Sequence, residues 1–168
     1  MTPRLLLCAC VVLLATTAGV ADPDKPAGSP AGKLAHMVAL PDDIKWMDGP
    51  PSLPPGAKLA ALDGDPFKEG IFVIRAKLPD GYIVPPHWHS TDENITVISG
   101  SFGIGLGEKI DKAKTRYLPA GSFMRMSKQE KHYAVAKGET IIQIHAMGPF
   151  DIHYVNPADD PTKKDTDK

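Results

Sequence analysis

The chain has 168 residues, of which 42% are hydrophobic and 23% charged, and its formal net charge is −1. This length suits one globular domain whose core needs neither disulfides nor a structural metal to fold. The near-neutral charge, without any basic cluster, argues against a nucleic-acid partner, which would require a basic face. Seventeen prolines and fifteen glycines favour a turn-rich β protein over a helical bundle.

Residues 1–21 have the pattern of a secretory signal peptide. Arg4 precedes an apolar run that extends to about Leu14, and small residues follow up to Ala21. The run is shorter than the about 20 residues that cross a bilayer. Cleavage after Ala21 would remove both cysteines, so the mature chain could use neither disulfides nor thiolate chemistry. We therefore expect an exported protein, periplasmic or secreted, with no membrane segment after cleavage.

The next boundaries follow from composition. Residues 22–35 are rich in Pro, Ala and Gly and predict a flexible leader, whereas residues 157–168 are charged and predict a mobile tail. Between them, residues 36–156 form one domain with an apolar period of two, which is typical of strands. A helical turn is expected within 41–47. Strands are expected at 71–78, 82–89, 93–100, 101–107, 114–118, 122–126, 131–136, 140–147 and 150–155, with a turn at 137–139 among others. Many short strands with regular turns indicate a β-sandwich or barrel.

Two histidines lie one residue apart in the segment 82–90. Pro85 and Pro86 favour an extended backbone there, so His87 and His89 point to the same side, with Cα atoms about 6.6 Å apart. Glu93 follows a turn at 90–92, and an antiparallel hairpin would place its carboxylate beside the two imidazoles. Two nitrogens and one carboxylate form a ligand set suited to Fe, Mn, Ni, Co or Zn.

This stretch resembles the first motif of the cupin superfamily, G-x5-H-x-H-x3,4-E-x6-G. The five motif positions are occupied by Gly81, His87, His89, Glu93 and Gly100. The resemblance extends over about residues 46–160 and points to small, single-domain, exported bacterial cupins. It implies an all-β, cupin-type double-stranded β-helix, a jelly-roll-like barrel. One divalent transition metal (Fe, Mn, Ni or Zn) would be held inside by these residues and a histidine from a second motif.

The second motif departs from the family pattern. Its usual form, G-x5-P-x-G-x2-H-x3-N, places the histidine three residues after the glycine, whereas ten residues separate Gly121 from His132 here. In one interpretation, residues 122–126 form a strand, 127–131 replace the usual turn, and His132 opens the next strand as the fourth ligand. In the alternative, the fourth position belongs to water or to another side chain, with His145 the obvious candidate.

Other residues are candidates for the pocket wall or for contacts behind the ligands. His145 shares its strand face with Gln143, and both would line the pocket if that face is internal. The segment 103–107, GIGLG, has no helix after it, so it predicts a strand of small residues rather than a nucleotide loop. The full set of pocket candidates is Tyr82, Phe102, Met124, Gln143 and His145.

The resemblance favours a metal-dependent enzyme that acts on a small organic molecule outside the cytoplasm. Dioxygenase-like oxidoreductase chemistry is expected first, and isomerase or lyase chemistry is open. Glu93 would be a ligand and the candidate acid or base. The alternative is a non-catalytic module that binds or senses a small ligand or a metal. Because cupins commonly pair, the resemblance also allows a homodimer.

Overall fold

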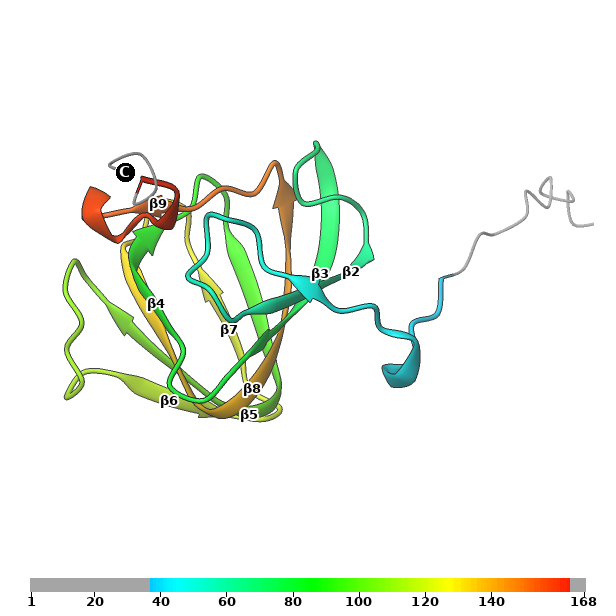
Figure 1. The fold of residues 1–168 in the computed structure, drawn as a ribbon, viewed down its shortest axis with the longest axis horizontal. Helices are drawn as coiled ribbons and strands as arrows, with labels where there is room; N and C mark the ends of the chain where they lie inside the picture. The colour runs from blue at the N-terminus through cyan, green and yellow to red at the C-terminus, as the bar shows by residue number, and fades with distance from the viewer. Residues whose placement is uncertain (1–36, 164–168) are drawn as a thin grey trace, which may run out of the picture. The chain divides into compact units, whose positions relative to one another are not determined.

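The computed structural model describes residues 37–163, and these form an antiparallel double-stranded β-helix (Figure 1), which confirms the predicted fold class. The predicted signal peptide and leader lie outside the described residues, as do residues 164–168. Within residues 37–163 no helix has the length and hydrophobicity needed to span a bilayer. The strands are β1 (Met47–Asp48), β2 (Lys58–Asp63), β3 (Gly70–Leu78), β4 (Ile83–Trp88), β5 (Glu93–Leu106), β6 (Arg116–Pro119), β7 (Phe123–Met126), β8 (His132–Gly148) and β9 (His153–Tyr154).

Short 3-10 turns flank the strands: η1 (Pro41–Asp43), η2 (Pro157–Asp159) and η3 (Pro161–Lys163). The first lies within the segment where a helical turn was predicted. The last two occupy residues 157–163, which the sequence assigns to a mobile tail. The side chain of Asn156 accepts a hydrogen bond from the Ala158 amide and so caps η2. Residues 157–163 therefore form ordered turns, and neither turn buries a side chain. For this reason the sequence has no apolar pattern there from which the turns could be predicted.

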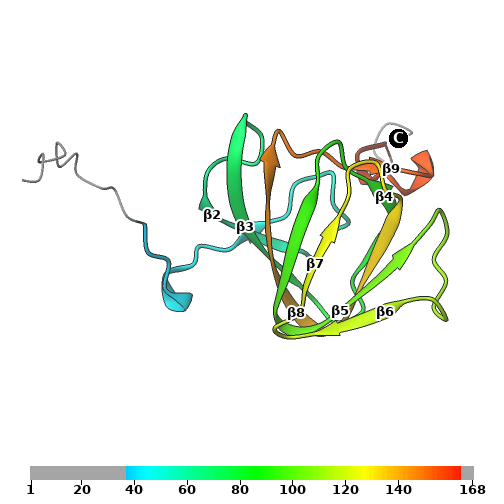
Figure 2. The same cartoon turned by 180° about the vertical axis from the view of Figure 1, so that it is seen from behind.

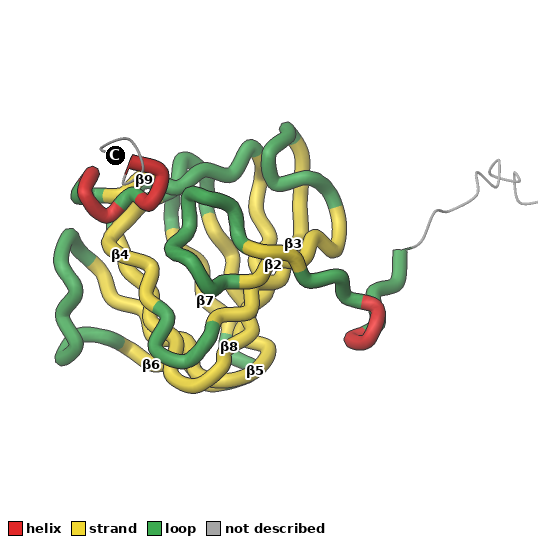
Figure 3. The backbone as a smooth tube through the Cα atoms, in the orientation of Figure 1, coloured by secondary structure: helices red, strands yellow, loops and turns green. Residues whose placement is uncertain are grey.

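Two long strands, β5 and β8, build both sheets of the barrel (Figures 1 and 2). The first half of β5 lies between β7 and the second half of β8, and that sheet continues through β3, β2 and β1. The second half of β5 lies between β6 and the first half of β8, and this sheet continues through β4 and β9. The tube view shows both strands curving from one sheet into the other (Figure 3).

Glycines lie where the two long strands bend. Gly100 in β5 has φ 76° and Gly138 in β8 has φ 71°, a backbone region that other residues adopt only at a cost. The sequence predicts separate strands on either side of these positions and a turn at 137–139. That prediction is wrong in one respect, because each pair of segments is a single bent strand that passes between the sheets.

β4 and β5 do not form the predicted hairpin. β4 pairs with β8 and β9, whereas β5 pairs with β6, β7 and β8. At Glu93 both edges of β5 are already taken, since Met126 of β7 and Ala146 of β8 lie opposite it. Residues 89–92 therefore cross from one sheet to the other, and Glu93 approaches the histidines from the opposite wall of the barrel.

Residues 103–106 of this segment belong to β5, which confirms the predicted strand of small residues up to Leu106. A Cβ atom on Gly105 would lie 2.1 Å from Cζ of Tyr133, and one on Gly103 would lie 2.7 Å from Cε1 of Tyr117. The fully buried Tyr133 ring thus occupies the space above Gly105, and its hydroxyl donates to the Asp111 carbonyl at 2.6 Å. These glycines serve packing, not phosphate binding.

The barrel interior is apolar. Alternate side chains of β3 and β8 face inward and are buried, in keeping with the period of two. The core includes the buried side chains of Phe72, Ile74, Leu78, Ile95, Val97, Phe102, Ile142 and Ile144.

Candidate metal centre

Three histidines from different parts of the chain converge inside the barrel. His87 lies in β4 and His132 is the first residue of β8, and the two are directly opposite each other in the β4–β8 ladder. His89 follows the last residue of β4. One nitrogen from each ring can be chosen so that all three lie within 4.8 Å of one another, and all three side chains are buried. The cluster His87–His89–His132 could therefore bind a metal ion.

Backbone carbonyls fix the tautomer of each imidazole. The Nδ1 atom of His87 donates to the Pro85 carbonyl at 2.7 Å, and Nδ1 of His132 donates to the Glu130 carbonyl at 2.8 Å. Nδ1 of His89 donates to the backbone carbonyl of Asp151. A carbonyl oxygen can only accept, so the proton is on Nδ1 and the lone pair of each ring is on Nε2, as metal ligation requires.

Burial also keeps the three imidazoles neutral. It lowers the pKa of His89 and His132, and lowers that of His87 well below its usual value, with smaller contributions to His87 from the other two rings. The Nε2 atom of His89 is buried and has no hydrogen-bond partner. Such an orphaned acceptor is costly, and a cation would satisfy it, so the residues present fit a divalent metal.

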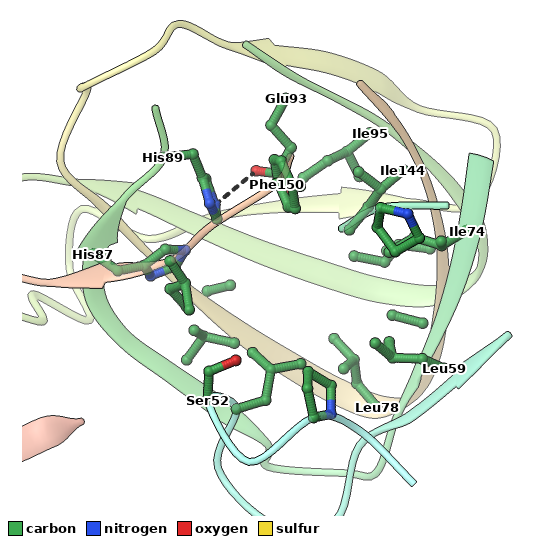
Figure 4. Close-up of a pocket in the computed structure, with 18 of the residues that line it drawn as sticks. Ser52, Leu59, Ile74, Leu78, His87, His89, Glu93, Ile95, Ile144 and Phe150 are labelled. Carbon is green, nitrogen blue, oxygen red and sulfur yellow. Dashed lines mark ion pairs between the residues drawn. The ribbon is translucent and has the colours of Figure 1, made fainter. Parts of the chain in front are cut away.

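Glu93 completes a mixed donor set from the opposite sheet. Its Oε2 lies 3.6 Å from Nε2 of His89 and 3.7 Å from Nε2 of His132, and Figure 4 shows the first of these pairs. Both gaps are shorter than twice a metal–ligand distance of about 2.1 Å, so one ion between them could contact both atoms. Burial raises the pKa of Glu93 to about 7, against a smaller opposing effect of His132. A divalent cation would remove the penalty for ionising this carboxyl.

A loop after β8 supports the centre, and the sequence analysis did not find it. Besides its carbonyl bond to His89, Asp151 accepts hydrogen bonds at its carboxylate from the Ser90 amide (2.8 Å), the Ser90 hydroxyl (2.5 Å) and Nε2 of His153 (2.8 Å). The Phe150 ring stacks on His89, with centroids 4.4 Å apart. Asp151 thus orients the His89 ring through its backbone carbonyl and fixes Ser90 through its carboxylate. No spacing rule in the sequence links positions 89 and 151, which are brought together only by the fold.

The centre lies at one end of a cavity of about 360 Å³. Figure 4 shows His87, His89 and Glu93 at this end, with Leu59 and Leu78 at the other. Of the five predicted pocket residues, Tyr82 and Phe102 line the cavity. The Tyr82 hydroxyl donates to the Pro54 carbonyl at 2.6 Å, and burial raises its pKa to about 12.

The other three pocket predictions do not agree with the structure. Met124 packs against the core but does not line the cavity. Gln143 and His145 lie on the outer face of β8, because the intervening Ile142 and Ile144 face the interior. Gln143 accepts a hydrogen bond from Nε of Arg75 at 3.1 Å. His145 stacks near Phe123, at 6.4 Å between centroids. His145 therefore cannot supply the fourth ligand, and the structure places His132 beside His87, His89 and Glu93 instead.

Comparisons with known proteins agree with this architecture. The structure resembles the polyketide cyclase RemF from Streptomyces resistomycificus (18% identity, 75% of this chain and 89% of that chain covered, TM-score 0.59). It also resembles an RmlC-like cupin from Shewanella frigidimarina NCIMB 400 (16% identity, 65% and 87% covered, TM-score 0.51). No curated protein sequence matches significantly. The chain therefore has the double-stranded β-helix fold that these two structures share. It belongs to the family described as "Domain of unknown function (DUF4437)", whose model matches residues 24–153.

Proposed function

We propose that this protein is a metal-dependent cupin enzyme that acts on a small organic molecule outside the cytoplasm. One observation carries the proposal: three imidazoles with fixed tautomers and a buried carboxylate face one point at the end of a cavity of about 360 Å³. Such convergence is expensive without a cation, because it buries a carboxyl and leaves the His89 Nε2 without a partner.

Each side chain of this site would have a distinct role. His87, His89 and His132 would hold the ion through Nε2, and their Nδ1–H bonds to carbonyls would keep the rings oriented. A bound Fe, Mn, Ni or Zn ion would supply Lewis acidity or, for the first three, redox chemistry. Glu93 would be a ligand and could hold a proton at Oε2, while the apolar walls exclude water from the reacting molecule.

The position of the remaining titratable groups favours dioxygenase-like chemistry over isomerase or lyase chemistry. Among the described residues, the other ionisable side chains that line the cavity are Tyr82 and Asp151. The Tyr82 hydroxyl donates to Pro54, and the Asp151 carboxylate accepts from Ser90 and His153. Reactions that need a separate general base have no free candidate here, whereas metal-centred oxidation needs none. The lack of a free general base on the cavity wall also favours the second candidate function, a non-catalytic module that binds a small ligand or a metal.

The exported location is part of the proposal. It is supported by the Arg4–Ala21 segment, which has the charge and apolar run of a signal peptide. N-terminal sequencing of the protein from the periplasm or medium would test it. A mature N-terminus at Asp22 is expected, and an intact Met1 on cytoplasmic protein would contradict it.

Elemental analysis tests the metal centre directly. The mature protein is purified after growth in media supplemented with iron, manganese, nickel or zinc, together with the His87→Ala/His89→Ala double variant. The outward-facing His145→Ala is the matched control. Wild type and the control should carry close to one ion per chain and the double variant close to none. Equal occupancy in all three proteins, or none in the wild type, would refute the proposed function. Oxygen uptake with small phenols and diketones then separates the enzyme from the binding module.

A further inference from the structure

Beyond the metal cluster, the cavity wall offers almost nothing polar. It is built by aliphatic side chains from both sheets, above all Ile74, Leu78, Ile95, Ile104, Ile142 and Ile144, together with Phe102. Within residues 37–163, no Lys, Arg, Asn or Gln side chain lines it. A carboxylate or phosphate placed away from the metal cluster, or an ammonium group placed at the end remote from His89 and Asp151, would therefore lose its hydration without meeting an opposite charge.

Two of the three polar side chains that line the wall beyond the metal cluster are already engaged by the protein. The Tyr82 hydroxyl donates to the Pro54 carbonyl, and the Asp151 carboxylate binds Ser90 and His153. Ser52, on the loop before β2, adds a single hydroxyl. A sugar or another polyol would bury several hydroxyls against aliphatic carbon, at about 1–3 kcal/mol for each unmatched group.

The size of the cavity limits the ligand further. A volume of about 360 Å³ equals roughly a dozen water molecules at ~30 Å³ each. Phe67, which lines the cavity, is 69% exposed, so the cavity reaches the surface beside it. The occupant is therefore a compact molecule that enters past Phe67.

We infer that the ligand of this site is a compact, uncharged and largely apolar molecule with one oxygen donor at one end, such as a phenol or an aryl ketone. The oxygen would face the metal cluster and the hydrocarbon body would fill the aliphatic chamber. This inference rests on the proposed function for the role of the oxygen, but the preference for an uncharged body depends only on the cavity wall. It disfavours dicarboxylates, sugars and phosphorylated metabolites as ligands.

Two isosteric phenols test the inference by calorimetry. 4-Propylphenol ends in a methyl group, and tyramine carries an ammonium group at the same position. The mature protein is loaded with zinc, which has no redox chemistry, and glucose serves as the polyol probe. Wild type should bind 4-propylphenol at least tenfold more tightly than tyramine and should not bind glucose. Tyramine or glucose binding as tightly as 4-propylphenol would overturn the inference.

Variants locate the effect in the chamber. Leu59 is a half-buried residue of β2 that lines the end remote from the histidines. Leu59→Glu should change the ratio of the two affinities at least tenfold in favour of tyramine. Leu53→Glu, on the loop that lines the cavity, provides a second position if the first variant does not fold. Ile71→Glu, on the exposed side of β3, is the matched control and should keep the wild-type ratio. An unchanged ratio in both Leu variants would contradict the inference.

The His87→Ala/His89→Ala protein separates this inference from the proposed function. It should still prefer 4-propylphenol to tyramine, with weaker binding of both, because the end of the cavity near Leu59 is remote from the substituted histidines. A wild type without metal that keeps this preference would refute the proposed function and leave the apolar chamber intact. A wild type that binds metal but shows no preference for 4-propylphenol would refute this inference and leave the proposed function standing.

Discussion

Glu93 provides a stability test whose sign depends on whether a cation is bound. In the metal-free protein, burial raises the pKa of Glu93 from 4.5 to about 7. Between these pH values the unfolded chain has released the proton while the folded chain retains it, so the stability falls as the pH rises. Above about pH 7 the whole penalty is present, and below pH 4.5 it is absent. At 1.36 kcal/mol per pKa unit, the penalty is about 3 kcal/mol.

Glu93→Gln replaces the carboxyl by a neutral group of the same shape. In EDTA at pH 8 we expect the variant to be more stable than wild type by about 3 kcal/mol, and the difference should shrink towards zero near pH 4.5. Burial lowers the pKa of each of the three histidines, so both proteins lose stability as the pH falls below 6.5. This loss cancels for His87 in the comparison, whereas Glu93 raises the pKa of His132, so the comparison at pH 8 is the decisive one. With saturating zinc the order should reverse, since the variant loses an anionic ligand.

Urea unfolding, followed by tryptophan fluorescence at several pH values with EDTA or zinc, measures these differences. Glu139→Gln changes an exposed carboxyl of β8 and is the matched control; its difference from wild type should not vary with pH or zinc. A Glu93→Gln protein that is less stable than wild type in EDTA at pH 8 would refute the reasoning, because it would mean that the ionised carboxylate stabilises the fold without a metal.

Three further predictions address the ligands, their support and the bends of the barrel. His132→Ala should lower zinc affinity at least tenfold in a chelator competition, whereas His145→Ala should leave it unchanged. The opposite result would mean that His145, and not His132, is the ligand. Asp151→Ala keeps the backbone carbonyl that accepts from His89 but removes the carboxylate bonds to Ser90 and His153. It should weaken zinc binding by about 10-fold to 100-fold while the wild-type ion count at saturation is kept, and an unchanged affinity would exclude a role of this carboxylate in orienting His89. Gly100→Ala should destabilise the fold, by urea unfolding, far more than Gly138→Ala. Both have positive φ, but only at Gly100 would the new Cβ meet backbone, 2.4 Å from the Glu139 carbonyl oxygen; equal effects would contradict this.

The sequence contained enough to predict the fold class and the ligand candidates, because both depend on local patterns. Period-two alternation marks strands wherever one face is buried, and the i, i+2 relation of His87 and His89 needs only an extended backbone. His132 could be proposed because a polar segment before it indicated the start of a strand. The crossing between β4 and β5 could not be predicted, since a short polar connection is compatible with a hairpin or with passage to the other sheet.

The outward position of His145 could not be predicted from the sequence, because two adjacent isoleucines precede it. Ile141 and Ile142 make both faces of β8 apolar at that point, so hydrophobicity alone does not say which face is internal. Counting by twos from His132 gives the answer: the inward positions remain even-numbered on both sides of the Gly138 bend, through Ile144. A ligand whose direction is known can thus set the orientation of a whole strand, even where the apolar pattern is ambiguous.

The metal centre depends on the closure of the barrel more than on any single strand. In the β5–β8 ladder Glu93 pairs with Ala146, and His132 pairs with Leu106 at the far end of β5. A flat strand would hold positions 93 and 106 roughly 43 Å apart, at about 3.3 Å per residue. Yet Oε2 of Glu93 lies 3.7 Å from Nε2 of His132. The bends fold each long strand back over the cavity, so that its two halves become opposite walls and its first residue reaches the other strand's first residue. The glycine that ends the first motif, Gly100, therefore helps to assemble the site although it touches no ligand, because the bend at that residue gives Glu93 its position.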